Sequence, residues 1–164
     1  MKLWGVVGSA NSGKSEVMGR LVTEFTRRGL TVSTLKQADH RFDVDREGKD
    51  SHRHRIAGAT EVLLASRNRW ALMHELKDED EPGLSDLLPR LASADLVLVE
   101  GFERDGHPKI EAHRQETGSP FLAPNDPTIR AIASDGGARA EGRPTFDLND
   151  TAAIADFIAG ELNL

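Results

Sequence analysis

The sequence predicts an α/β fold, in which helices flank a mostly parallel sheet and one β-hairpin is inserted. Two continuously apolar runs, at about 3–7 and 96–99, suit strands that are buried on both faces of a parallel sheet. A segment with helical spacing at about 16–28 follows the first run, and the strand-like stretch 30–35 then completes a βαβ unit. The length of 164 residues, with 38% hydrophobic residues, predicts one domain spanning 1–164.

A glycine-rich loop connects the first predicted strand to the first helix. Its sequence is Gly8-Ser9-Ala10-Asn11-Ser12-Gly13-Lys14-Ser15, the phosphate-binding loop (P-loop) pattern. Successive backbone N–H groups in such a loop point toward one position at a helix N-terminus, which suits phosphate oxygens. Lys14 would reach the β- and γ-phosphates, and the Ser15 hydroxyl would hold Mg²⁺. We therefore expect a P-loop NTPase-type domain with nucleotide contacts from Gly8, Asn11, Ser12, Gly13, Lys14, Ser15 and Glu16.

The remaining elements follow from hydrophobic periodicity and turn residues. We expect helices at about 50–59, 84–92 and 151–162, the last capped by Asn149 or Asp150, and strands at 61–66, 69–75, 109–114 and 129–133. The strand at 109–114 alternates like a half-exposed strand. The strands 61–66 and 69–75 flank a tight turn and form the hairpin. An uncovered hairpin edge can pair with another chain, so 60–75 is a candidate dimer edge.

A second acidic group is expected beside the phosphate loop. Asp95 precedes and Glu100 ends the apolar run 96–99. The loop lies at the C-terminal end of its strand, so a parallel neighbour must present its own C-terminal residue there. Asp95 lies about 16 Å away along the strand, at ~3.3 Å per residue. Glu100 is therefore the expected Mg²⁺ ligand, and Lys14 and Glu100 are the candidate catalytic groups.

Two further polar stretches remain open between a functional and a structural interpretation. The loop after the second strand carries Asp39, His40, Asp43 and Asp45, which suit either substrate or metal contacts or a solvated loop. Asp135 follows the late strand, where it suits either recognition of guanine N–H groups or a turn.

Composition restricts the remaining classes of function. The net charge of −6 argues against broad nucleic-acid binding, and the absence of cysteine excludes disulfides and thiolate metal sites. The first strand begins at residue 3 and no apolar run approaches ~20 residues, so we expect a cytoplasmic protein without membrane contact. The six histidines show no zinc-site spacing.

Three stretches together resemble the MobB family of molybdopterin-guanine dinucleotide biosynthesis adapter proteins. They are the loop Gly8–Ser15, the run Phe42-Asp43-Val44-Asp45-Arg46-Glu47-Gly48-Lys49-Asp50-Ser51 and the run Asp95–Phe102 leading to Pro108-Lys109-Ile110-Glu111. The resemblance implies a GTP-binding accessory protein with Mg²⁺ and weak GTP hydrolysis. It also implies a homodimer that assists the molybdenum cofactor guanylyltransferase, with molybdopterin as a further candidate ligand. The sequence departs from the family after the second strand, where it has Lys36-Gln37-Ala38-Asp39-His40 and relatives tend to have Lys-His-Asp-His-His, so two histidine positions are lost.

Other functions on the same fold have to be separated from this one. A P-loop small-molecule kinase using ATP or GTP is the main alternative, although a long arginine-bearing lid is not evident. A nickel-type metallochaperone would need a cysteine cluster that the sequence lacks. The sequence contains no Asn-Lys-x-Asp guanine motif, so GTP preference follows from the resemblance alone. Slow hydrolysis is expected because no arginine finger or general base is evident.

Overall fold

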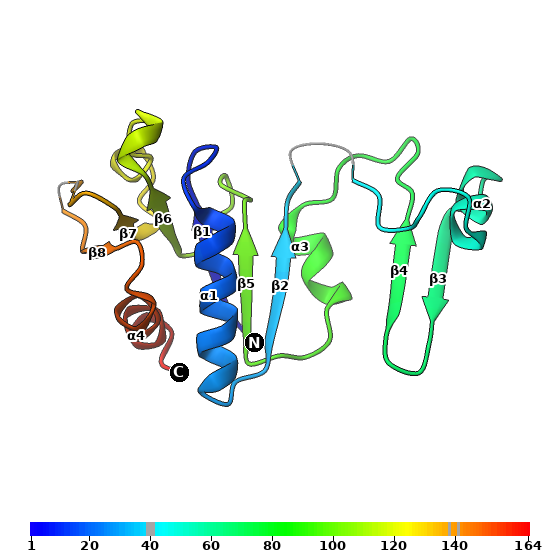
Figure 1. Cartoon of the computed structure of the whole chain (residues 1–164), viewed down its shortest axis with the longest axis horizontal. Coiled ribbons are helices and arrows are strands. Elements are labelled where there is room, and N and C mark those ends of the chain that lie inside the picture. Colours follow the sequence, from blue (N-terminus) through cyan, green and yellow to red (C-terminus); the bar gives the residue numbers. More distant parts are fainter. Residues whose placement is uncertain (39–41, 138, 141) are drawn as a thin grey trace. The chain divides into compact units, whose positions relative to one another are not determined.

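The computed structural model describes residues 1–38, 42–137, 139–140 and 142–164, so Asp39 and His40 lie outside the described residues. The chain divides into two compact units (Figure 1). The first comprises Met1–Gln37 and Leu88–Leu164, and the second is the intervening segment Ala38–Leu87. The hairpin that the sequence predicts as an insertion lies within the second unit, and a single domain spanning 1–164 stays a prediction.

A six-stranded sheet forms the centre of the first unit. In space its strands follow the order β2-β5-β1-β6-β7-β8, and each neighbouring pair is parallel. Their bounds are β1 (Lys2–Val7), β2 (Val32–Lys36), β5 (Leu96–Glu100), β6 (Lys109–His113), β7 (Ile129–Ser134) and β8 (Thr145–Asp147). The predicted α/β fold is confirmed. Because all six strands run the same way, their carboxyl ends lie along one edge of the sheet (Figure 1).

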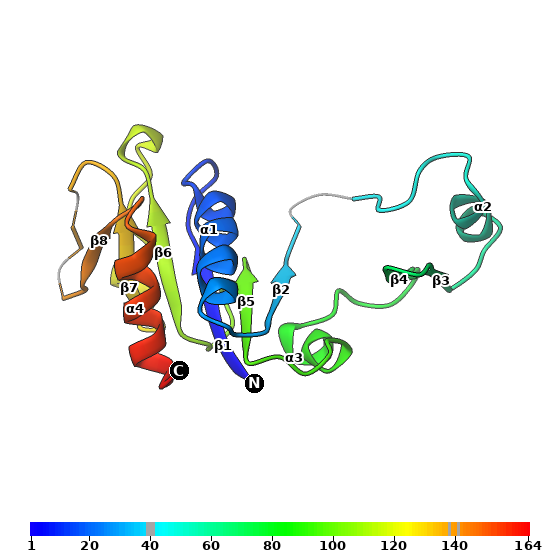
Figure 2. The same ribbon diagram turned by 60° about the horizontal axis from the view of Figure 1, so that its bottom comes forward.

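Two long helices cover one face of this sheet. Figure 2 shows α1 (Lys14–Arg27) and α4 (Thr151–Leu162) side by side in front of the strands. Their apolar faces share one core with the strands, and its buried members include Trp4, Leu21, Phe25, Ile154 and Ile158. Asp150 rather than Asn149 caps α4, because its carboxylate accepts a hydrogen bond from the Ala153 N–H at 3.0 Å.

The opposite face carries a smaller core over β1 and β7. Val7, Ile129 and Ile132 are buried there beneath the loop 114–128, which contains the 3₁₀ turns η2 (Gln115–Thr117) and η3 (Ala123–Asn125). The expectation of a half-exposed strand at 109–114 is wrong, since all five residues of β6 are buried. This strand lies between β1 and β7, and its polar side chains are bonded rather than solvated.

The second unit contains α2 (Asp50–Ile56), the antiparallel pair β3 (Glu61–Ala65) and β4 (Trp70–His74), and α3 (Leu84–Leu87). The predicted hairpin is confirmed, with Leu63 facing Leu72 in its register. The helix expected over 84–92 is shorter, because Pro89 disfavours helical backbone at the residue before it, and the 3₁₀ turn η1 (Leu88–Arg90) follows. None of the helices in the described ranges is long and apolar enough to cross a membrane.

Candidate functional site

The loop after β1 depends on two glycines that no other residue could replace without strain. Gly8 has a φ of +145°, and a Cβ on it would fall 2.2 Å from the Ala112 carbonyl oxygen of β6. Gly13 has a φ of +92° and forms the N-cap of α1 without any side-chain cap. The backbone of the loop therefore approaches β6 closely and enters the helix in a left-handed conformation, which glycine adopts at no steric cost.

Hydrogen-bond donors gather at this entry to α1. The first intrahelical bond runs from the Val17 N–H to the Gly13 carbonyl at 3.0 Å, so the N–H groups before it have no helical partner. The Ser12 hydroxyl is 1% exposed and, within the described residues, has no hydrogen-bond partner. Lys14 folds over the loop and donates to the carbonyls of Gly8 and Ser9, the latter at 2.8 Å. Unpaired donors, an ammonium group and a helix N-terminus together fit an anion such as phosphate.

A carboxylate and a second ammonium group meet the first turn of α1. The Ser15 hydroxyl donates to Glu100 Oε1 at 2.7 Å, and Lys36 Nζ lies 2.9 Å from the same oxygen and 3.3 Å from Ser15 Oγ. The three residues come together because Lys36 and Glu100 end the parallel neighbours β2 and β5 in register. Asp95 lies at the opposite end of β5, where hydrogen bonds from the Thr31 hydroxyl and N–H lower the pKa of its carboxyl group.

The pair of Ser15 and Glu100 fits the chemistry of Mg²⁺. Magnesium is usually held by one or two protein oxygens together with phosphate oxygens and water, rather than by a cage of several side chains. The described part of the chain contains no group of three His, Cys, Asp or Glu side chains that could hold a metal ion. The roles of Ser15 and Glu100 as metal ligands stay predictions.

Arg114 lies over the loop from the neighbouring strand. It directly follows β6, and its guanidinium group bonds the Glu16 carboxylate of α1. A Cβ built on Gly13 would lie 3.2 Å from Arg114 Nε. The sequence interpretation missed both Arg114 and Lys36. Arg114 follows β6, which neighbours β1, and Lys36 ends β2, which neighbours β5. A basic residue at the carboxyl end of a neighbouring strand was the sequence signal that could have identified both.

The other candidate residues occupy different surroundings. Asp135 accepts a hydrogen bond at 2.8 Å from the N–H of Gln115, which lies 20 positions earlier in the chain, so the carboxylate joins two distant segments rather than closing its own turn. Its role toward a base stays a prediction. Asn11 lies in the loop with a φ of +61°. In the second unit, Asp43 and Asp45 both bind the Arg55 guanidinium, at 2.8 and 2.9 Å.

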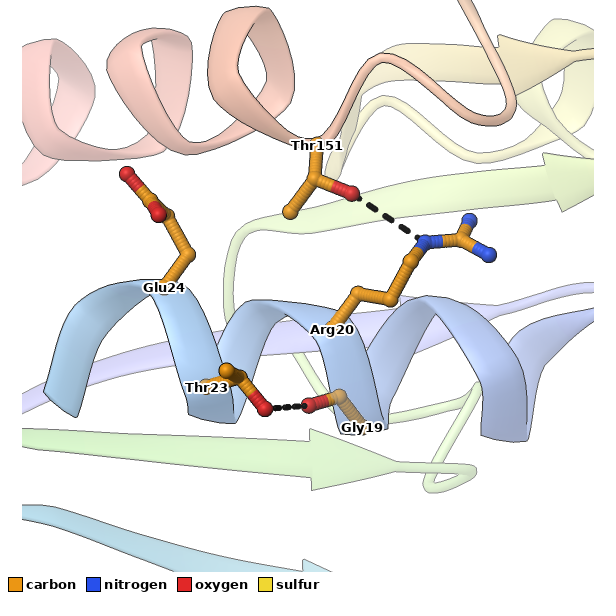
Figure 3. A pocket seen from close by; sticks show the side chains of 5 residues that line it. All are labelled: Gly19, Arg20, Thr23, Glu24 and Thr151. Carbon is orange, nitrogen blue, oxygen red and sulfur yellow. Dashed lines mark hydrogen bonds between the residues drawn. The ribbon is translucent and has the colours of Figure 1, made fainter. Parts of the chain in front are cut away.

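A pocket of about 320 Å³ lies between α1 and α4, lined by Gly19, Arg20, Thr23, Glu24 and Thr151 (Figure 3). Arg20 donates to the Thr151 hydroxyl at 3.1 Å and to the Leu148 carbonyl at 2.6 Å. The side chain of Leu148 in turn packs close to Gly13, 3.4 Å from the position of a Cβ there. These hydrogen bonds from Arg20 hold the connection between β8 and α4 against α1, the helix that follows the phosphate loop.

Comparison with known proteins identifies relatives along nearly the whole chain. The molybdopterin-guanine dinucleotide biosynthesis adapter protein of Haemophilus influenzae is 39% identical over 98% of this chain and 89% of its own length. The adapter protein of the same description from Escherichia coli is 36% identical over 91% of this chain and 86% of its own length. A crystal structure of molybdopterin-guanine biosynthesis protein B superimposes with a TM-score of 0.77 at 27% identity, covering 99% of both chains. A family model described as molybdopterin guanine dinucleotide synthesis protein B matches residues 3–135, so the chain belongs to the MobB family.

Proposed function

We propose that this protein is a GTP-binding adapter in the biosynthesis of molybdopterin guanine dinucleotide. Two observations support the proposal. The relatives of 39% and 36% identity are described as adapter proteins of that biosynthesis. The site at the carboxyl edge of the sheet combines a phosphate loop with the Ser15–Glu100 pair, 2.7 Å apart, and this pair is the observation that carries the nucleotide assignment.

In this proposal each residue of the loop contacts a different part of the nucleotide's phosphate groups. The N–H groups at the start of α1 and the buried Ser12 hydroxyl bind phosphate oxygens, and Lys14 leaves the loop carbonyls to pair with the β- and γ-phosphates. Ser15 and Glu100 hold Mg²⁺, which neutralises negative charge on the phosphates. Within the Ser15–Glu100 pair the anion is Glu100, and its carboxylate positions the ion rather than accepting a proton from water.

Hydrolysis of GTP is proposed to be weak. Lys14 stabilises charge on the γ-phosphoryl group, but the Glu100 carboxylate beside the loop already accepts from Ser15 and Lys36. A carboxylate engaged in this way is a poor general base. Sites that lack a complete set of catalytic groups are slower by about 10³–10⁵-fold. A partner protein would complete the site, and we propose the guanylyltransferase that joins GMP to molybdopterin as that partner.

Calorimetric titration tests the nucleotide assignment directly. GTP, ATP and GDP are titrated with Mg²⁺ into the wild type, Lys14→Ala and the matched control Lys2→Ala. Lys2 begins β1, at the end of that strand away from the phosphate loop. We expect selective GTP binding that Lys14→Ala abolishes and Lys2→Ala leaves unchanged. Unchanged GTP affinity in Lys14→Ala would refute the site. The titrations are repeated with the guanylyltransferase present, which is expected to change the GTP affinity. Tight ATP binding whose affinity does not change when the transferase is present would instead favour a small-molecule kinase.

We also propose that the protein is a homodimer joined through the hairpin. In the part of the chain that the structure describes, the hairpin sheet has two strands, and its side chains Leu63, Trp70 and Leu72 are 61, 66 and 42% exposed. Isolated two-stranded hairpins are marginally stable in water, so an apolar hairpin gains most by pairing with a second copy. Light scattering at micromolar concentration is expected to give a dimer for the wild type and Leu164→Glu, and a monomer for Leu72→Glu. Leu164, at 43% exposure, is the matched control. A monomeric wild type would contradict the proposal.

A further inference from the structure

Arg114 places a guanidinium group at the phosphate loop from within the same chain. Strand β6 pairs with β1 in parallel, with Val7 opposite Glu111, so the residues after both strands leave the sheet at the same edge. Those residues are the glycine-rich loop and Arg114. The Arg114 Nε and Nη2 atoms lie 3.2 and 3.5 Å from the position that a Cβ on Gly13 would occupy. Any larger residue at 13 would therefore displace the guanidinium group.

The backbone of Arg114 is held more firmly than its guanidinium group. The Arg114 carbonyl accepts hydrogen bonds from the N–H and the hydroxyl of Thr117, at 3.1 and 2.8 Å, which fixes the backbone. The guanidinium group is held by Glu16, whose side chain is 61% exposed, and more remotely by Glu116 at 3.8 Å. Ion pairs with such exposed carboxylates contribute little in water, because solvent screens them. Arg114 can therefore exchange Glu16 for a stronger anion without leaving the loop.

Phosphate is the anion that such an arrangement selects. A guanidinium group donates two parallel hydrogen bonds to phosphate oxygens, and these charge-assisted bonds are stronger than a solvent-exposed pair with a carboxylate. The Glu16 carboxylate, in the first turn of α1, also lies where it would repel a phosphate tail unless a cation neutralises it. A purely structural bridge between β6 and α1 would satisfy the same contacts, so the two interpretations have to be separated by their effect on binding.

We propose that Arg114 binds the phosphate tail of the nucleotide directly, and that Glu16 holds the guanidinium group beside the loop before the nucleotide arrives. This inference rests on the proposed nucleotide-binding function and adds a cis-acting arginine to it. The arginine is a binding residue contributed by the chain itself rather than by a partner.

Calorimetric titration of GTP with Mg²⁺ tests this assignment. The variants are Arg114→Ala, Arg114→Lys, Glu16→Gln and the double variant, with Arg130→Ala as matched control. Arg130 also pairs with a glutamate, Glu161 at 3.1 Å, but it is the second residue of β7 and lies toward the opposite edge of the sheet. We expect Arg114→Ala to weaken GTP binding about tenfold or more, and Arg114→Lys to recover part of the loss. Arg130→Ala should stay within about twofold of the wild type. Apo-protein melting curves confirm that each variant is folded.

The double variant separates direct contact from neutralisation of Glu16. If Arg114 contacts phosphate, Arg114→Ala remains weak when combined with Glu16→Gln. Recovery of wild-type affinity in the double variant would overturn the inference, because Arg114 would then act only by neutralising Glu16. Wild-type affinity in Arg114→Ala itself, while Lys14→Ala has lost binding, would also overturn it and leave the proposed function intact. A wild type that binds no nucleotide would overturn both.

Discussion

His107 should make the first unit sensitive to acid. The side chain is 8% exposed, neither ring nitrogen has a hydrogen-bond partner within the described residues, and the ring packs directly over Gly5 of β1. Burial, reinforced by the Lys109 ammonium group and partly offset by Asp105 and Asp126, lowers the pKa of His107 from 6.5 to about 4. The folded protein therefore disfavours the protonated ring, which the unfolded chain accepts freely.

The sign and the size of the effect follow from this difference in pKa. Because the folded pKa lies below the unfolded one, the contribution of His107 to stability is complete above pH 6.5 and is lost as the pH falls toward 4. Relative to pH 7, proton linkage predicts a loss in the free energy of unfolding of about 2 kcal/mol by pH 5 and about 3 kcal/mol by pH 4. These losses are a large part of the stability of an ordinary domain.

The assay compares urea unfolding of the wild type and His107→Gln at pH 7, 6, 5 and 4. Both proteins carry Trp70→Phe, so that fluorescence reports the buried Trp4 of β1 alone. Asp126 also has a lowered pKa and contributes to acid sensitivity in both proteins, so the difference between them isolates His107. His54→Gln, which removes an exposed histidine, is the control and should track the wild type. A wild-type advantage that stays constant from pH 7 to pH 4 would refute the reasoning.

Three further changes have defined expectations. Gly8→Ala places a Cβ 2.2 Å from the Ala112 carbonyl at a φ of +145°, and should lower the free energy of unfolding by about 2–4 kcal/mol in urea titrations; a loss below ~1 kcal/mol would contradict the close packing. Asp150→Ala removes the cap on the Ala153 N–H and should cost about 1 kcal/mol in the same assay, whereas an unchanged midpoint would show that the cap contributes nothing. Glu100→Gln should raise the Mg²⁺ concentration for half-maximal GTP binding by about tenfold, and an unchanged Mg²⁺ requirement would remove Glu100 from the metal site.

The central strands and the loop could be predicted because their requirements are local. A strand covered on both faces needs an unbroken apolar run, which 3–7 and 96–99 show. The length of a strand also sufficed to place Glu100, rather than Asp95, beside the loop. β8 was not predicted, because its three residues are too few to show a periodic pattern.

The burial of β6 and the remaining charges of the site could not be predicted in the same way. Lys109 is fully buried because it donates to the Asp105 carbonyl and to the Thr128 hydroxyl, both at 2.6 Å. Glu111 accepts from two N–H groups of the following loop, while burial raises the pKa of its carboxyl group. Such partners are supplied by tertiary structure and leave no periodic signal. For the same reason, Lys36 and Arg114 read as ordinary polar residues, since their partners are distant along the chain.

The strand order also constrains when the protein can fold during its synthesis. β1 and β2 follow each other in sequence but do not touch in the sheet, because β5 lies between them. Among the described strands, β1 pairs with β5 and β6, which end at residues 100 and 113, and the whole segment Ala38–Leu87 is translated before them. The first βαβ segment therefore leaves the ribosome without a strand partner and must wait for the later half of the chain. A chain truncated before residue 113 would contain the complete sequence of the glycine-rich loop. It would still lack the complete strand β6, against which the loop packs.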